Sequence, residues 1–168
     1  MTVGKLLDRR LVEAAALLHD VDKLAAVRPE VAGLAHGAGS AEWLARHGHP
    51  ELAEAIVGHP VTRLEDGAWF ERWFPMASAE ALVVAYSDKR AGQRLEPMAE
   101  RFASWERRYP PDWRTKNALE RWSPETLADI RLRAARLEAR VCELADVEPR
   151  EVRRLEWTGR ALRYARQA

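Results

Sequence analysis

The sequence contains little cysteine and no long apolar run, and each of these absences excludes a class of protein. Its 168 residues include a single cysteine, Cys142, so an internal disulfide framework is excluded and a reducing compartment is favoured. No apolar stretch approaches the roughly 20 residues that a membrane-spanning helix needs. Near the N-terminus, charged residues follow the apolar pair Leu6-Leu7 from Asp8 onward, so this apolar run is too short for a signal peptide. We therefore expect a cytoplasmic protein with no membrane partner.

An excess of charge of one sign is also missing. The chain has 27 lysine and arginine residues against 26 aspartate and glutamate residues, which leaves a formal net charge of +1. Proteins that bind nucleic-acid polymers usually carry a basic excess or a basic stripe. The arginines near the C-terminus alternate with glutamate and leucine, which is typical of a salt-bridged helix surface. We therefore expect no nucleic-acid polymer as a partner.

Alternating β-branched runs are almost absent, whereas alanine, leucine, glutamate and arginine are abundant. These four residue types are strong helix formers, so the sequence predicts an all-α fold of about eight helices. Candidate caps are Asp8, Ser40, Ser78 and Ser123, and Pro50 suits a first helical turn. The expected helices cover residues 8–24, 40–48, 50–59, 78–91, 95–108 and 123–145, with a last one from 148 and a helical aromatic patch at 69–74.

The strongest internal break is the run Tyr109-Pro110-Pro111, because proline cannot continue a helix. It predicts a helical bundle over residues 1–108 and a C-terminal helical extension over residues 109–168 that packs on the bundle.

Imidazole and carboxylate side chains gather in the first half of the chain. Together these groups bind divalent transition metals through nitrogen and oxygen donors. Lys23 follows Asp20 by three residues, on the same face of the predicted helix, where its ammonium could hold a substrate phosphate. The candidate metal ligands, in chain order, are His19, Asp20, His36, His59 and Asp88.

Four segments around these residues resemble the HD-domain superfamily of metal-dependent phosphohydrolases. The run Leu17-Leu18-His19-Asp20-Val21-Asp22-Lys23 resembles its His-Asp signature, and the segment from His36 to Leu44 resembles its second histidine segment. Ala55-Ile56-Val57-Gly58-His59 resembles the next histidine segment, and Ala85-Tyr86-Ser87-Asp88-Lys89 resembles the distal aspartate segment. The resemblance covers roughly residues 5–108.

The resemblance implies an HD-type helical bundle with one or two divalent ions, drawn from Mn, Co, Ni, Fe and Zn, or Mg. His19, Asp20 and Asp88 would hold one ion, and Asp20 would bridge to a second ion on His36 and His59. A metal-activated water would then attack the phosphorus of a small phosphate ester, with a nucleotide as the expected substrate. Asp20 and Lys23 are the candidate catalytic residues. Weaker candidates for substrate phosphate are Arg28, Arg90 and Arg94.

The sequence also departs from the family pattern. No histidine precedes His19, so the helix that normally carries the first metal histidine is missing from this sequence. Position 22 is aspartate where many members have glycine, and we expect Asp22 to lie outside the direct ligand set. Pro60 stands where some dinuclear members have a further histidine. A homodimer or a rearranged C-terminal helix would then cover the apolar surface left by the missing helix.

These departures leave two alternatives open. One is a catalytically degenerate HD-type module that binds a metal, a nucleotide or a protein partner. The other, less favoured, is an HD-type di-iron oxygenase, which needs a complete set of ligands for two ions.

Several other residues are expected to be structural. Cys142 lies on the apolar face of the predicted long helix, where a buried thiol is the usual outcome. His47 and His49 flank Gly48 in a turn and are expected to face solvent. Lys89 and Arg90 look like surface residues. The aromatic residues 69–74 are expected to pack in the core, although they could also form a wall of a substrate pocket.

Overall fold

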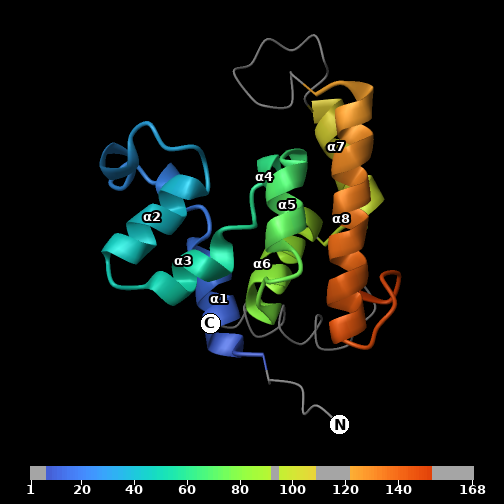
Figure 1. Ribbon diagram of the computed structural model, residues 1–168, viewed down its shortest axis with the longest axis horizontal. Coiled ribbons are helices and arrows are strands. Elements are labelled where there is room, and N and C mark those ends of the chain that lie inside the picture. Colours follow the sequence, from blue (N-terminus) through green and yellow to red (C-terminus); the bar gives the residue numbers. More distant parts are fainter. Residues whose placement is uncertain (1–6, 92–94, 109–121, 153–168) are drawn as a thin grey trace, which may run out of the picture.

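The computed structural model describes residues 7–91, 95–108 and 122–152, with the backbone alone for residues 105–108. The described residues form α-helices, two short 3-10 helices and no strand beyond an isolated bridge between Ala91 and Leu95 (Figure 1). The predicted all-α class is therefore confirmed. The elements are α1 (Arg9–Leu18), η1 (Val21–Lys23), η2 (Arg28–Val31), α2 (Ala38–Arg46), α3 (Pro50–Ile56), α4 (Thr62–Glu65), α5 (Gly67–Trp73), α6 (Ala79–Arg90), α7 (Met98–Arg108) and α8 (Pro124–Leu144).

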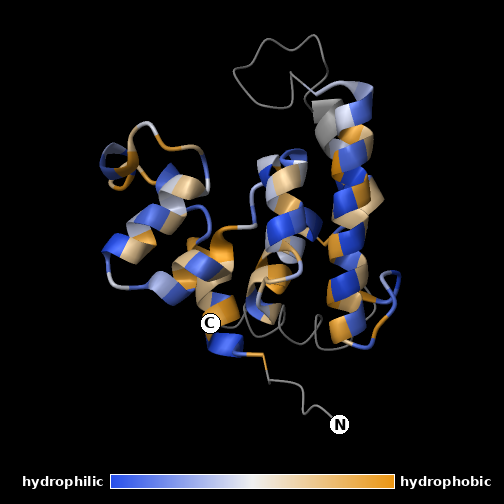
Figure 2. Ribbon diagram, in the orientation of Figure 1, coloured by the Kyte–Doolittle hydropathy of each residue, from blue (hydrophilic) through white to orange (hydrophobic). Residues whose placement is uncertain are grey.

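Helix α6 is the centre of the molecule, with α1 and α3 on one side and α8 on the other (Figure 1). It is buried on both sides, as expected for a helix without a clear polar face. Leu82, Ala85 and Tyr86 pack in an apolar core with α5, α7 and α8. Val84 packs in a second core with α1, α2 and α3. Helix α8 carries apolar and hydrophilic residues in alternation, which suits a helix with one buried face (Figure 2).

Several predicted helix starts are confirmed. The Asp8 carboxylate accepts hydrogen bonds from the backbone N–H groups of Arg10 and Leu11 at the start of α1. Ser78 and Ser123 accept in the same way at the starts of α6 and α8. Pro50 occupies the first turn of α3, where its missing N–H costs no hydrogen bond.

Three predicted boundaries in the N-terminal half are wrong, and all lie at the site. The helix that begins at Pro50 ends at Ile56 rather than near His59. The first helix ends at Leu18 rather than near Leu24, because the backbone of Asp20 leaves the helical region before the short helix η1. Ser40 does not cap the second helix, which starts at Ala38 after Gly37. Ser40 is instead buried inside α2, and its hydroxyl accepts a hydrogen bond from the backbone N–H of Asp22.

The C-terminal part is described only in part. Helix α8 packs against α4, α6 and α7. The predicted boundary at Tyr109-Pro110-Pro111 and most of the predicted last helix lie outside the described residues. No helix in the described ranges combines the length and the apolar character needed to cross a membrane.

Candidate metal centre

The fold brings the five predicted metal ligands together from separate elements. His19 and Asp20 follow the C-terminus of α1, and His36 lies in the loop before α2. His59 follows α3, and Asp88 lies in the last turn of α6. Since α6 packs against both α1 and α3, the two helix ends and the last turn of α6 converge on one point.

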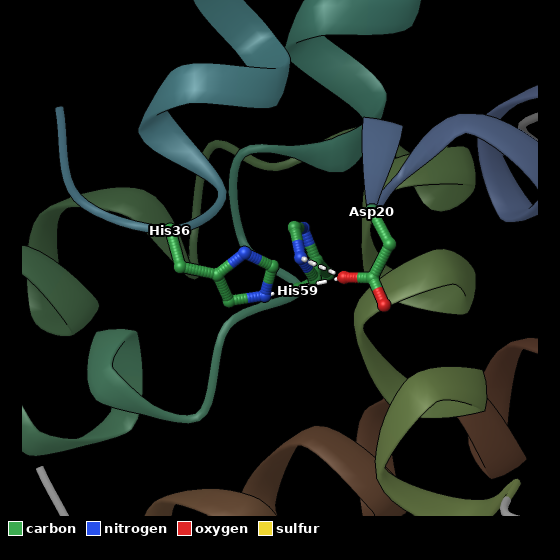
Figure 3. Close-up of side chains that lie close together, drawn as sticks. All are labelled: Asp20, His36 and His59. Carbon is green, nitrogen blue, oxygen red and sulfur yellow. Dashed lines mark ion pairs between the residues drawn. The ribbon is translucent and has the colours of Figure 1, made fainter. Parts of the chain in front are cut away.

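The tightest group consists of Asp20, His36 and His59 (Figure 3). Asp20 Oδ1 lies 3.2 Å from His36 Nε2 and 3.7 Å from His59 Nε2. One ligand atom from each of the three residues lies within 4.8 Å of the others, so a single ion can reach all three. The described residues therefore contain a three-ligand group that could hold a metal ion.

His19 and Asp88 flank this group. His19 Nε2 lies 3.6 Å from Asp88 Oδ1 and 3.7 Å from Asp20 Oδ2. The rings of His19 and His59 are in edge contact, with centroids 4.9 Å apart. One oxygen of Asp20 thus faces His36 and His59 while the other faces His19, so its carboxylate lies between the two predicted ligand sets.

Each histidine turns Nε2 toward the cluster because an acceptor faces its Nδ1. For His19 the acceptor is the carbonyl oxygen of Ala16, and for His59 it is that of Ile56, both at 2.7 Å. Each of these carbonyls belongs to the residue three positions before the histidine, in the last turn of α1 or α3. His36 lies in a loop, and its Nδ1 faces the Asp22 carboxylate instead.

The electrostatics keep the carboxylates ionised. Burial acts to raise the pKa of Asp20, but its interactions with His36, His59 and Lys23 outweigh burial and hold that pKa well below its usual range. The pKa of Asp88 is also lowered, since His19 and Lys89 outweigh the effect of burial. Asp88 in turn raises the pKa of His19, and Asp20 raises that of His36. Burial lowers the pKa of His59, so this ring stays neutral with a lone pair available.

A cation fits this arrangement. The side chain of His59 is 1% exposed, and its Nε2 has no hydrogen-bond partner among the described residues. The 3.7 Å separation from Asp20 Oδ1 is too long for a hydrogen bond. An orphaned buried nitrogen is costly, and a metal ion bound between it and Asp20 would remove that cost.

A pocket of about 530 Å³ opens beside the cluster. Such a volume suits a small-molecule ligand. Among the described residues, no tryptophan or phenylalanine lines it, so the aromatic residues 69–74 do not form its wall. Trp69 and Trp73 instead stack on each other beside the core of α5 and α8. The lining consists of Ala16, His19, Asp20, Lys23, His36, Pro60, Val61, Val84, Ser87, Asp88, Ala91 and Arg101.

Only some of the residues predicted to contact substrate phosphate lie at this pocket. Lys23 lines it, and its ammonium donates to Asp20 Oδ2 at 2.7 Å. Arg28 lies in a neighbouring hollow with Lys23 and donates to the Lys23 carbonyl at 3.2 Å. Arg90 lies elsewhere: its guanidinium is buried and donates to Glu138 and Tyr86. Arg94 lies outside the described residues.

The predictions about which other residues are buried or exposed were partly right. Cys142 is buried, and His47 and His49 are exposed, as predicted. Lys89 and Arg90 are buried, so their assignment to the surface was wrong.

Lys89 is a part of the site that sequence reasoning missed. Its buried ammonium donates to the carbonyl oxygens of His59, at 2.5 Å, and Ala85, at 3.3 Å. Burial lowers the pKa of Lys89 to about 8. The signal that would have found it is the helical spacing from Leu82 through Ala85 to Lys89, which places all three on one face. Ser87 and Arg101, which line the pocket, were also missed.

Comparison of the chain with protein-family models, with curated proteins and with solved structures finds no match.

Proposed function

We propose that this protein is a metal-dependent phosphohydrolase of the HD-domain kind, which acts on a small phosphate ester, with nucleotides as the substrate class to test first. The observation that carries the proposal is the convergence of three histidines and two aspartates around Asp20, with a buried histidine nitrogen that lacks a partner. His36, His59 and Asp20 would hold one divalent ion, and His19 and Asp88 would complete a second position beside it.

When bound, the ion would supply Lewis-acid stabilisation of phosphoryl oxygens and would lower the pKa of a water. Asp20, which faces histidines on both sides, would be a ligand of the ion. The ionised state of Asp88, favoured by His19 and Lys89, adds negative charge that attracts a divalent cation. These residues explain why a cation would bind at this end of α6 rather than at another carboxylate.

Substrate binding would use the same pocket. Lys23 lies at its rim beside Asp20, where its ammonium can contact a phosphate oxygen. Arg101 of α7 lines the pocket as well and brings a guanidinium, which suits phosphate geometry. Val61 and Val84 form small apolar walls for the rest of the ester.

The decisive experiment measures metal content and phosphate release together. Purified protein is stripped with a chelator, reloaded separately with Mn, Co, Ni, Fe, Zn or Mg, and assayed for phosphate release from a panel of nucleotides and simple phosphate esters. We expect one or more of these ions to bind and to support release. Failure of every ion to bind, or of every loaded form to release phosphate, contradicts the proposal.

A second candidate function is a metal- or nucleotide-binding module without hydrolytic activity. The sequence supports it through Pro60, since a residue without a metal-binding side chain stands where some dinuclear members of the family that it resembles carry a further histidine. The same experiment separates the two functions: metal binding without phosphate release from any ester supports the module.

A further inference from the structure

His36 is the one cluster histidine that no helix end orients. His19 and His59 each face a backbone carbonyl three residues earlier, but His36 lies in the loop between η2 and α2. Its Nδ1 lies 3.1 Å from both oxygens of Asp22. A carboxylate therefore occupies the position that a helix carbonyl occupies for the other two rings.

Asp22 is itself fixed from several directions. Its side chain is 8% exposed. One of its oxygens accepts the backbone N–H of Gly37 at 2.8 Å, and its own backbone N–H donates to Ser40 Oγ at 3.1 Å. Burial acts to raise its pKa, but the Gly37 N–H, His36 and Ser40 lower it, so the carboxylate is ionised and can only accept hydrogen bonds.

We propose that Asp22 is a positioning residue for the metal site: its carboxylate accepts a hydrogen bond from Nδ1 of His36 and so turns Nε2 toward the ion that Asp20 and His59 would share. The inference rests on the metal site of the proposed function. Both ring nitrogens of His36 face a carboxylate, since Asp22 lies at Nδ1 and Asp20 Oδ1 lies 3.2 Å from Nε2. An ion at the cluster would take the place of the proton on Nε2, and Asp22 would then keep the remaining proton on Nδ1. A carboxylate behind a metal-bound histidine also makes the imidazole a stronger donor.

The test compares Zn²⁺ binding to apo wild-type protein and to Asp22→Asn by calorimetry. Asparagine keeps the shape and an oxygen for the Gly37 N–H but removes the charge. We expect Asp22→Asn to bind Zn²⁺ roughly 10–100-fold more weakly, the usual effect of losing such a partner. Asp66→Asn is the matched control, because Asp66 also accepts a backbone N–H, that of Trp69, but does not line the pocket beside the cluster. We expect its Zn²⁺ affinity to equal that of wild type.

A spectroscopic measurement on the wild-type protein makes the result independent of how well the variant folds. Nitrogen-15 spectra of the imidazoles in the Zn²⁺-loaded protein should show the His36 proton on Nδ1 and the metal on Nε2. The opposite tautomer, or equal Zn²⁺ affinity of Asp22→Asn and wild type, overturns the role of Asp22. Absence of Zn²⁺ binding to wild type overturns both the role of Asp22 and the Zn²⁺ site. Binding to wild type without phosphate release contradicts the proposed hydrolysis alone.

Discussion

At the scale of single residues, Asp20 lies beside every histidine of the cluster and not only beside His19, its neighbour in the sequence. One of its oxygens faces His36 and His59, and the other faces His19 and Lys23. This is possible because α1 ends at Leu18, so Asp20 is free to turn away from the direction that a continued helix would impose.

Substitution of Asp20 is therefore expected to remove the site. Asp20→Ala should lose detectable Zn²⁺ binding while it keeps its helical circular dichroism, because its carboxylate is partly exposed and joins both ligand sets. Calorimetry of the apo protein checks the binding. The control is His47→Ala, since His47 is exposed and stacks on Trp43 rather than on the cluster. Full metal content in Asp20→Ala would show that the ligands are elsewhere.

A second residue-scale prediction concerns two glycines with nearly the same φ angle. Gly37 and Gly48 have φ of +80° and +85°, so alanine at either should cost about 1–2 kcal/mol. A Cβ at Gly37 would also lie 2.2 Å from Pro60 Cγ and 2.9 Å from His59 Cε1, whereas a Cβ at Gly48 would meet nothing within 4 Å. Gly37→Ala should thus destabilise more in urea unfolding and should weaken Zn²⁺ binding. Equal losses in the two variants would argue against this close packing.

At the scale of elements, α6 connects the metal cluster to the C-terminal core. Its last turn carries Asp88 toward the cluster, while Arg90, two residues later, lies on the other side and contacts α8. The Arg90 guanidinium donates to Glu138 at 2.6 Å, to the Tyr86 hydroxyl and to the carbonyl of Glu96. This buried network attaches α8 to α6 without a contact to the metal ligands.

Removal of Glu138 is expected to act on stability alone. Arg90 is 2% exposed, so Glu138→Ala leaves a buried charge without its carboxylate and should cost about 3 kcal/mol in unfolding free energy. Glu143→Ala is the control, because it removes an exposed pair with Arg140 and should change stability by less than about 1 kcal/mol. Zn²⁺ affinity should be unchanged in both. A large loss of affinity in Glu138→Ala would mean that the two regions are coupled.

At the scale of the whole molecule, the ligands span residues 19–88 and meet only when α1, α3 and α6 pack together. The unfolded chain cannot hold an ion in this way, so metal binding should stabilise the fold. Large apolar side chains also remain on the surface near the start of the chain: Leu17 is 84% exposed and Leu24 is 58% exposed. The homodimer that would cover such residues stays a prediction.

Metal addition provides the whole-molecule test. Free Zn²⁺ at about 100 times its dissociation constant should add about 2.7 kcal/mol of stability. For a chain of this size that corresponds to a rise of roughly 5–10 °C in Tm. The measurement is a thermal melt with Zn²⁺, then with excess chelator, which should return the Tm to its starting value. Asp20→Ala should show no rise, and a similar rise in that variant would place the ion elsewhere.

The sequence by itself determined the all-α class and most helix starts, because caps, prolines and helix propensity act over a few residues. Asp8, Ser78 and Ser123 cap the helices they were predicted to cap. The sequence also singled out all five residues of the cluster, since residue type and order are visible in it. The resemblance to the HD-domain superfamily stays a prediction.

Only the tertiary structure decided which neighbours those residues have. It ended the first helix at Leu18, moved Ser40 into the interior and placed Asp22 behind His36. It also buried Lys89 and Arg90, two adjacent cations, in contacts with different partners. Such contacts join residues 14 to 48 positions apart, and local propensity contains no information about them, because they form only when separate helices pack.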